Sequence, residues 1–217
     1  MITKIFLCAS MLIMVSVVAC DASVYTSEGD EHYKQGLDLQ RERRFEEAIV
    51  KYDEAIRLDP SYAEAYGNRG SAYYDLGKFE QAIQNQDSAI RLDPQDAIAY
   101  YNRANAYGSL NQHRRAIQDL DSAIRLDSEF AGAMLNRGLE YANTSVGEFQ
   151  RAIKDFDDVI RLEGQSLTAA RAYGGRAVAL AHLGMDDQSQ QDVDRSVQMG
   201  IDRGFLEAMI DAITNVR

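Results

Sequence analysis

Three asparagines recur at equal spacing along the 217-residue chain, where Asn68, Asn102 and Asn136 lie 34 residues apart. A carboxamide offers one hydrogen-bond acceptor and two donors, so it can pair with a peptide amide whatever side chain the peptide carries. A row of such groups would hold an extended polypeptide with little sequence preference. Four further side chains that could complete the same surface are Asn105, Tyr33, Tyr74 and Tyr101.

Cys20 has a different chemistry, because it directly follows the apolar segment 5–19 and is itself followed by polar residues. That segment is shorter than the ~20 residues of a membrane-spanning helix and suits the core of a signal peptide. The run 17–20, Val-Val-Ala-Cys, resembles the bacterial lipoprotein signal, whose cysteine is thioether-linked to diacylglycerol and becomes the new amino terminus. The resemblance implies a signal peptide over 1–19 and a lipidated cysteine with a short tether over 20–28.

Lipidation would anchor the mature chain on the extracytoplasmic, periplasmic side of a bacterial membrane, because two or three acyl chains give stable binding. The choice between the inner and the outer membrane stays open. An ordinary secretory signal or an uncleaved anchor is the alternative interpretation. Since Cys8 would leave with the signal and Cys20 would carry the lipid, the mature chain would have no free thiol.

The charge balance excludes several classes of function. The chain has 23 Lys and Arg against 34 Asp and Glu, a net charge of −11 and a pI near 4.7. Nucleic acid is not an expected partner, because phosphate binding needs clustered basic side chains. His32, His113 and His182 have no repeated partner, and the sequence has no phosphate-binding or hydrolase motif. We therefore predict no catalytic residue, no metal, no cofactor and no small-molecule substrate.

The remainder of the chain is repetitive. The hexapeptide Ala-Ile-Arg-Leu-Asp-Pro at 55–60 recurs at 89–94 and, with a final serine, at 123–128. This 34-residue period resembles the tetratricopeptide repeat family, in which each repeat is a helix–turn–helix unit. The resemblance implies an all-α fold, a right-handed α-α superhelix (solenoid) of about five repeats across residues 29–203. The predicted repeats are 29–62, 63–96, 97–130, 131–166 and 170–203, followed by a capping helix over 204–217.

We number positions 1–34 within each repeat and name its two helices A and B. Position 8 is small wherever helices A and B are expected to cross closely. The residues at position 8 are Gly36, Gly70, Ala104, Gly138 and Ala177. Asp202 is expected to cap the last helix, which would cover the exposed end of the solenoid. The apolar stripe predicted for that helix consists of Phe205, Leu206, Met209, Ile210 and Ile213.

Position 7 is arginine in repeats 2 to 5, as Arg69, Arg103, Arg137 and Arg176, but glutamine in repeat 1. The preceding B helices carry acids at positions 25 and 31. Those at position 25 are Asp53, Asp87, Asp121 and Asp157, and those at position 31 are Asp59, Asp93, Asp127 and Glu163. We interpret the arginines as structural ion pairs between repeats, with a ligand-binding ladder as the alternative. Arginines four residues after position 25 are expected to form i,i+4 pairs with those acids. These are Arg57, Arg91, Arg125 and Arg161.

In this family helix A lines the concave surface, and positions 2, 5, 6, 9, 12 and 13 face the groove. The three asparagines occupy position 6 and resemble the asparagine ladder of O-linked N-acetylglucosamine transferase. Because they would face solvent, they are expected to contribute little to packing. The carboxylate clamp of co-chaperone repeats is matched by Asn68 alone in repeats 1–3, and in repeats 3–5 by Asn105 and Asn136, with Arg171 a near match. Recognition of a C-terminal carboxylate is therefore weakly supported.

These features predict a membrane-tethered scaffold or adaptor that mediates protein–protein interactions in the bacterial cell envelope. Its partner would be a protein or peptide in the concave groove. One alternative is a chaperone-like module that binds extended polypeptides, and another is a cytoplasmic adaptor with a plain N-terminal anchor. No residue in the sequence identifies the partner.

Overall fold

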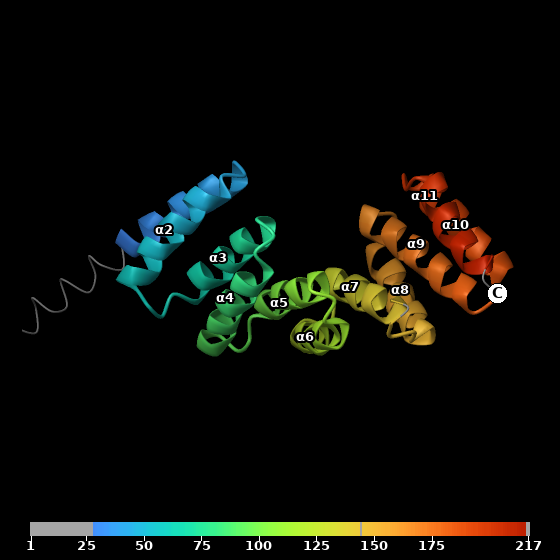
Figure 1. Cartoon of the computed structure of the whole chain (residues 1–217), viewed down its shortest axis with the longest axis horizontal. Coiled ribbons are helices and arrows are strands. Elements are labelled where there is room, and N and C mark those ends of the chain that lie inside the picture. The colour runs from blue at the N-terminus through green and yellow to red at the C-terminus, as the bar shows by residue number, and fades with distance from the viewer. Residues whose placement is uncertain (1–27, 144, 216–217) are drawn as a thin grey trace, which may run out of the picture. The chain divides into compact units, whose positions relative to one another are not determined.

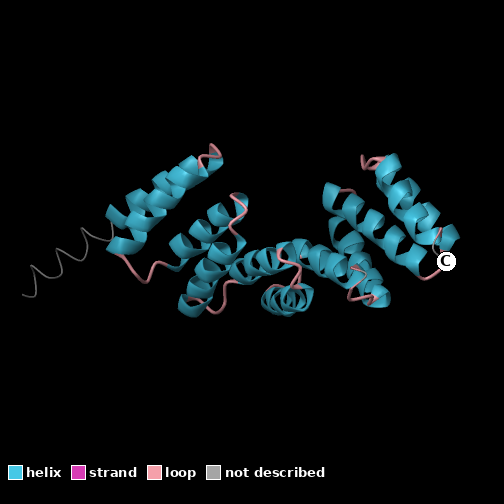
Figure 2. Ribbon diagram, viewed as in Figure 1, coloured by secondary structure: helices cyan, strands magenta, loops and turns pink. Residues whose placement is uncertain are grey.

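The computed structural model describes residues 28–143 and 145–215, and all of the regular structure in these ranges is helical (Figure 2). The predicted signal peptide 1–19 and Cys20 lie outside the described residues. The all-α prediction is confirmed for the part that is described. None of the helices found there is long and apolar enough to cross a membrane. The chain divides into two compact units, of which the first ends at Pro94.

The first unit consists of two helical hairpins, each made of a helix A and a helix B. Its helices are 28–41, α2 (Phe45–Leu58), α3 (Ala63–Asp75) and α4 (Phe79–Leu92) (Figure 1). Pro60 follows the end of α2 by two residues, as expected for a residue that cannot donate a backbone hydrogen bond to a continuing helix. Gly77 has a φ of 71° in the turn between α3 and α4, a conformation that glycine adopts without a steric penalty.

The second unit continues the same alternation of A and B helices. Its helices are α5 (Ala97–Ser109), α6 (His113–Leu126), α7 (Ala131–Ala142), α8 (Phe149–Glu163), α9 (Leu167–His182), α10 (Asp186–Gln198) and α11 (Arg203–Thr214) (Figure 1). Residues 167–169, which lie between the predicted repeats 4 and 5, form the first turn of α9. The Ser166 side chain caps this turn by accepting a hydrogen bond from the backbone N–H of Ala169 at 3.0 Å.

The final helix is capped as predicted, because the Asp202 carboxylate accepts a hydrogen bond from the Phe205 backbone N–H at 2.7 Å. Its apolar stripe is narrower than predicted. Leu206 is buried and packs with Ala177 and Val193, whereas Phe205 is 61% exposed and Met209 is 40% exposed. The inward face of α11 is therefore formed around Leu206, with Ile210 packed beside it.

Within each repeat, the size of position 8 is matched to the side chain at position 24 of helix B. A Cβ atom on Gly138 would lie 2.7 Å from the ring of Phe156, and one on Gly36 would lie 2.5 Å from the ring of Tyr52. Where position 24 is a smaller aliphatic residue, position 8 is alanine. These pairs are Ala104 with Leu120 and Ala177 with Val193. Close crossing of the two helices thus depends on the combined volume of the pair.

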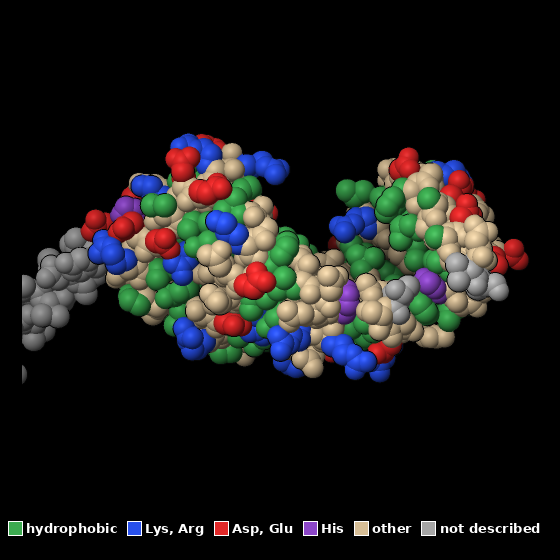
Figure 3. Space-filling view, in the orientation of Figure 1, with side chains coloured by type: hydrophobic (Ala, Val, Ile, Leu, Met, Phe, Trp, Pro, Cys, Tyr) green, Lys and Arg blue, Asp and Glu red, His purple; other side chains and the backbone are tan. Residues whose placement is uncertain are grey.

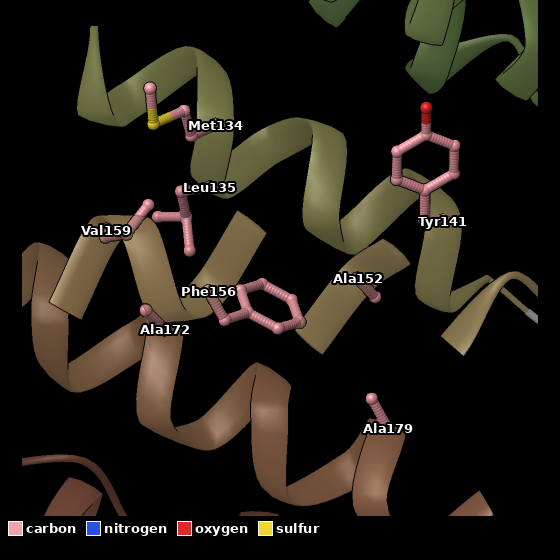
Figure 4. Close-up of a cluster of buried hydrophobic side chains, with 8 residues drawn as sticks. All are labelled: Met134, Leu135, Tyr141, Ala152, Phe156, Val159, Ala172 and Ala179. Carbon is pink, nitrogen blue, oxygen red and sulfur yellow. The ribbon is translucent and has the colours of Figure 1, made fainter. Parts of the chain in front are cut away.

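Phe156 is the centre of the core formed by α7, α8 and α9 (Figure 4). Its fully buried ring lies between α7 and α9, next to Leu135 and Ala172. A Cβ atom on Gly175 would come within 2.6 Å of this ring. Gly175 stands at position 6 of repeat 5, and the ring of Phe156 occupies the space that an asparagine side chain would need there.

Candidate functional site

In the second unit, Asn136 is held by two hydrogen bonds from its side-chain nitrogen. The Nδ2 atom donates to the Tyr101 hydroxyl at 3.2 Å and to the Oδ1 atom of Asn105 at 2.7 Å. Asn136 is on α7, whereas Tyr101 and Asn105 are on α5, so the bonds join the A helices of two successive repeats. The structure thus brings together three of the residues predicted for the groove.

These hydrogen bonds leave complementary groups on two neighbouring carboxamides. Within the described residues, the Oδ1 atom of Asn136 accepts no hydrogen bond and the Nδ2 atom of Asn105 donates none. Both side chains are half-buried. An open acceptor beside an open donor is the hydrogen-bonding pattern that the edge of an extended peptide requires, because each peptide unit supplies one N–H and one C=O.

The first unit contains the same pairing of asparagine and tyrosine. The Nδ2 atom of Asn68 donates to the Tyr33 hydroxyl at 2.8 Å and to the backbone oxygen of Glu64 at 3.0 Å. Burial raises the pKa of Tyr33, with a further upward contribution from Glu64, so its hydroxyl stays protonated at neutral pH. The Oδ1 atom of Asn68 accepts no hydrogen bond from residues 28–94 that the structure describes.

The expectation that position 6 contributes little to packing is wrong for these two asparagines. Both are half-buried, and each links its helix A to helix A of the preceding repeat. Sequence reasoning missed this link because the tyrosine stands at position 5, which is not constant among the repeats. Tyr33 and Tyr101 hold that position in repeats 1 and 3, whereas Gly67 holds it in repeat 2.

The other residues predicted for the groove are Asn102 and the tyrosines. Asn102 lies half-buried on α5, within the second unit. Tyr74 is 36% exposed and packs against Phe79, with ring centroids 5.4 Å apart. Tyr33 and Tyr101 also pack against rings of their own units, since Tyr101 lies 4.9 Å from Phe130 between centroids. The tyrosines are therefore packing residues as well as candidate groove residues.

The position-7 arginines are ion-paired as predicted. Arg137 shows the arrangement in full, because it binds two acids rather than one. Arg137 binds Asp121 of the preceding helix B through Nη1 at 2.7 Å. It also holds Asp155 of its own repeat with two bonds of 2.7 and 2.8 Å. Hydrogen bonding to Asp155 raises the pKa of Arg137, so the group is always charged.

The other position-7 arginines follow this arrangement within their units. Arg69 binds Asp53 and Asn85, Arg103 binds Asp119, and Arg176 binds Asp157 and Asp192. The second partner of each arginine is the residue at position 23 of the same repeat, and this pairing was not predicted from the sequence. A sequence signal for it exists, because position 23 is an acid or an asparagine in every repeat with the arginine, whereas repeat 1 has Lys51 and Gln35.

The i,i+4 pairs expected for Arg125 and Arg161 are not formed. Arg125 donates to Ser122 and Arg161 pairs with Asp158, both three residues earlier, rather than with the acids at position 25. Those acids are engaged elsewhere, because Asp121 pairs with Arg137. The position-31 acid Asp127 accepts a hydrogen bond from the backbone N–H of Glu129 at 3.0 Å and so organises a turn.

One half-buried pair was not predicted from the sequence. The Nδ1 atom of His113, at the start of α6, lies 2.7 Å from a carboxylate oxygen of Glu140 on α7. The pair joins a B helix to the next A helix, so we interpret it as structural. In the described ranges 28–143 and 145–215, no group of His, Cys, Asp and Glu side chains could hold a metal ion.

Comparison with known protein families finds matches over part of the chain, residues 29–130. Residues 29–77 and 70–111 match a model described as TPR repeat, and residues 97–130 match one described as tetratricopeptide repeat. Hsp70-Hsp90 organizing protein 1 of Arabidopsis thaliana is 43% identical over 49 residues, which is 23% of this chain and 9% of that protein. The corresponding protein of Triticum aestivum is 40% identical over 48 residues, 22% of this chain and 8% of the relative. The chain thus matches under a tenth of the length of these relatives.

Solved structures with the same fold extend over more of the chain. MamA has a TM-score of 0.68 at 27% identity, covering 76% of this chain and 93% of MamA. YrrB, described as a TPR protein with an unusual peptide-binding site, has a TM-score of 0.69 at 21% identity, covering 86% and 97%. A TPR domain of Spaghetti (RPAP3) bound to an HSP90 peptide has a TM-score of 0.54 at 22% identity, covering 55% and 95%. At the 21–22% identity of YrrB and Spaghetti, the structural similarity shows that the fold is shared and nothing further.

Proposed function

We propose that the chain, whose residues 29–130 match tetratricopeptide-repeat models, is an adaptor that binds an extended segment of a partner protein along its A helices. The observation that carries this proposal is the open hydrogen-bonding edge of Asn136 and Asn105. The acceptor on Asn136 would take a backbone N–H of the segment, and the donor on Asn105 would bind a backbone C=O. Repeats of this type are typically protein-interaction modules rather than enzymes.

The hydrogen bond from Asn136 to Tyr101 gives this edge a fixed orientation. A carboxamide that is free to rotate would lose conformational entropy on binding, whereas one already held in place loses less. The partner's backbone would thus meet a preorganised acceptor. The same reasoning applies to Asn68, which Tyr33 and the Glu64 carbonyl hold in the first unit.

Exposed apolar side chains are present on the two helices that carry the open edge. Leu139 is 41% exposed at position 9 of α7, and Ile98 is 61% exposed at position 2 of α5. Backbone hydrogen bonds would supply the register of the bound segment, and apolar contacts would supply much of its binding free energy. The relation to Hsp70-Hsp90 organizing proteins over 49 residues supports an adaptor role without naming the partner.

We extend the proposal to the location of the protein. The Val-Val-Ala-Cys run at 17–20 supports lipid attachment at Cys20, which would tether the adaptor to the extracytoplasmic side of a bacterial membrane. Labelling with a palmitate analogue tests the tether. Label should be incorporated by the native chain and lost on Cys20→Ala, and equal labelling of the two would contradict it.

A photo-crosslinking experiment tests the binding surface. A photoreactive amino acid placed at Leu139 should capture a defined partner, whereas the same group at the exposed Gln118 of α6 should not. Adding Asn136→Ala to the Leu139 probe should reduce the crosslinked product several-fold. Equal capture from Gln118, or capture that does not respond to Asn136→Ala, would contradict binding along the A helices.

A further inference from the structure

The turn between the helix 28–41 and α2 has an unusual residue at its left-handed position. Arg43 has a φ of 61° there. At the equivalent position 15 of the other four repeats, the residues with positive φ are Gly77, Asn111, Gly147 and Gly184. Glycine and asparagine tolerate this conformation, whereas a long side chain is disfavoured in it. Such an outlier points to a functional reason for the side chain that is present.

The Arg43 side chain extends toward a pocket of about 440 Å³ within the first unit. Its guanidinium lies 5.8 Å from the centre of the Phe45 ring. The pocket is lined by Leu37, Gln40, Arg41, Arg43, Phe45, Asn68 and Asp75. It therefore combines apolar walls with two arginines and with the open carboxamide oxygen of Asn68.

Several hydrogen-bond donors in this pocket have no acceptor. Among residues 28–94 that the structure describes, the Arg43 guanidinium makes no hydrogen bond. Arg41 uses only its Nη1 atom, which binds Asp38 at 2.9 Å in a pair that is about 70% exposed or more on both sides. Gln40 accepts a hydrogen bond from the Tyr52 hydroxyl through Oε1, so its Nε2 atom is still available. Basic and acidic side chains lie side by side at this end of the hairpin (Figure 3).

We propose that this pocket binds a carboxylate side chain, Asp or Glu, of the polypeptide that the adaptor holds. The planar Arg43 guanidinium matches a carboxylate with two parallel hydrogen bonds. At the same time, the Asn68 oxygen can accept a backbone N–H of the same segment. The proposal rests on the proposed function, because the occupant is part of the partner protein. It adds a preference for acidic sequences to a surface that otherwise recognises backbone.

The acids near the pocket do not cancel this preference. Burial raises the pKa of Asp75, and the nearby Arg43 partly counteracts that rise. Asp75 is the single acid among the lining residues, which include two arginines, so the lining carries more positive than negative groups. Asp38 does not line the pocket, and its exposed ion pair with Arg41 is weak, so the arginine is free to exchange partners.

Fluorescence anisotropy with short synthetic peptides tests the proposal on the full-length protein in detergent. The probes are serine–alanine peptides with two central glutamates, with glutamines, or with phosphoserines, all blocked at both ends to remove terminal charges. At low salt the glutamate peptide should bind about 5- to 10-fold more tightly than the glutamine peptide. Arg43→Gly should reduce this ratio to about 1 while raising the melting temperature, because glycine relieves the turn. Arg114→Ala removes an exposed arginine of α6 and should leave the ratio unchanged.

The outcomes separate this proposal from the proposed function. Asn68→Ala, which removes the carboxamide in the same pocket, should weaken both peptides without changing their ratio. Equal binding of glutamate and glutamine peptides would overturn the acidic preference and leave backbone recognition intact. A preference lost equally in Arg114→Ala would overturn the pocket, because it would reflect general charge attraction. Binding of the phosphoserine peptide alone would overturn the assignment to carboxylates. If no peptide binds, the pocket proposal fails, and the crosslink from Leu139 decides the proposed function separately.

Discussion

Asn136 donates a hydrogen bond of 3.2 Å to the hydroxyl of Tyr101, which lies 35 residues earlier in the chain. Asn68 and Tyr33 repeat the arrangement at the same separation, with a distance of 2.8 Å. Each bond joins the A helices of successive repeats. It uses the amide nitrogen of the asparagine and leaves the amide oxygen open as an acceptor. One side chain thereby links the repeats and, in the proposed binding mode, offers its oxygen to the partner.

This double role predicts that Asn136→Ala reduces stability as well as binding. Two hydrogen bonds to half-buried partners are lost, each with a net contribution of about 0.5–1.5 kcal/mol. We expect the free energy of unfolding to fall by about 1–2 kcal/mol in a urea titration. Gln118→Ala removes an exposed carboxamide from α6 and should leave the free energy within about 0.5 kcal/mol of native. An equal, small effect of both changes would contradict the structural half of this role.

Arg137→Ala should be more destabilising, because it leaves the buried Asp155 carboxylate without its partner. Asp155 has a side-chain exposure of 5%, and an uncompensated charge at such a site typically costs about 3–5 kcal/mol. Since the arginine is itself 20% exposed, we expect about 2–3 kcal/mol by chemical denaturation. A double-mutant cycle should show stronger coupling to Asp155 than to the half-exposed Asp121. Unchanged stability with lost partner binding would instead assign the arginine to ligand recognition.

The matched sizes at positions 8 and 24 predict a rescue. Gly138→Ala places a methyl group 2.7 Å from the Phe156 ring and should cost about 1–3 kcal/mol through overpacking. In a Phe156→Leu background the same change should cost less, because Ala104 with Leu120 already forms this pair in repeat 3. Thermal denaturation of the single and double variants gives the coupling energy. A strictly additive result would show that the two positions do not constrain each other.

Much of this architecture follows from the 34-residue period, which predicts the alternating helices and the pairing of Arg137 with Asp121. The second partner, Asp155, is found only when positions 7 and 23 of the same repeat are compared. The hydrogen bond between Asn136 and Tyr101 is less accessible to sequence reasoning, because the tyrosine at position 5 is replaced by glycine in repeats 2 and 5 and by leucine in repeat 4. A period identifies what all repeats share, whereas the site depends on how particular repeats differ.

Arg43 is such a difference, and it predicts a trade between stability and recognition. A non-glycine residue in the left-handed region is disfavoured by roughly 1–2 kcal/mol. Arg43→Gly should therefore raise the free energy of unfolding by about 1 kcal/mol, measured by urea titration. Arg43→Asn should give a smaller gain, since Asn111 occupies the equivalent turn in repeat 3. A loss of stability in both variants would mean that the arginine stabilises the turn.

Backbone recognition by the carboxamide edge is tested most directly with one partner segment in chemically altered forms. The segment captured by the Leu139 probe would be synthesised in its native sequence, with single backbone N-methyl groups, and with altered side chains. We predict that N-methylation at one peptide unit lowers the affinity about 10-fold or more, because it removes the N–H that Asn136 would accept. Asn136→Ala should bind the N-methylated and native segments with equal affinity. An affinity that follows the side chains and ignores N-methylation at every position would contradict the account.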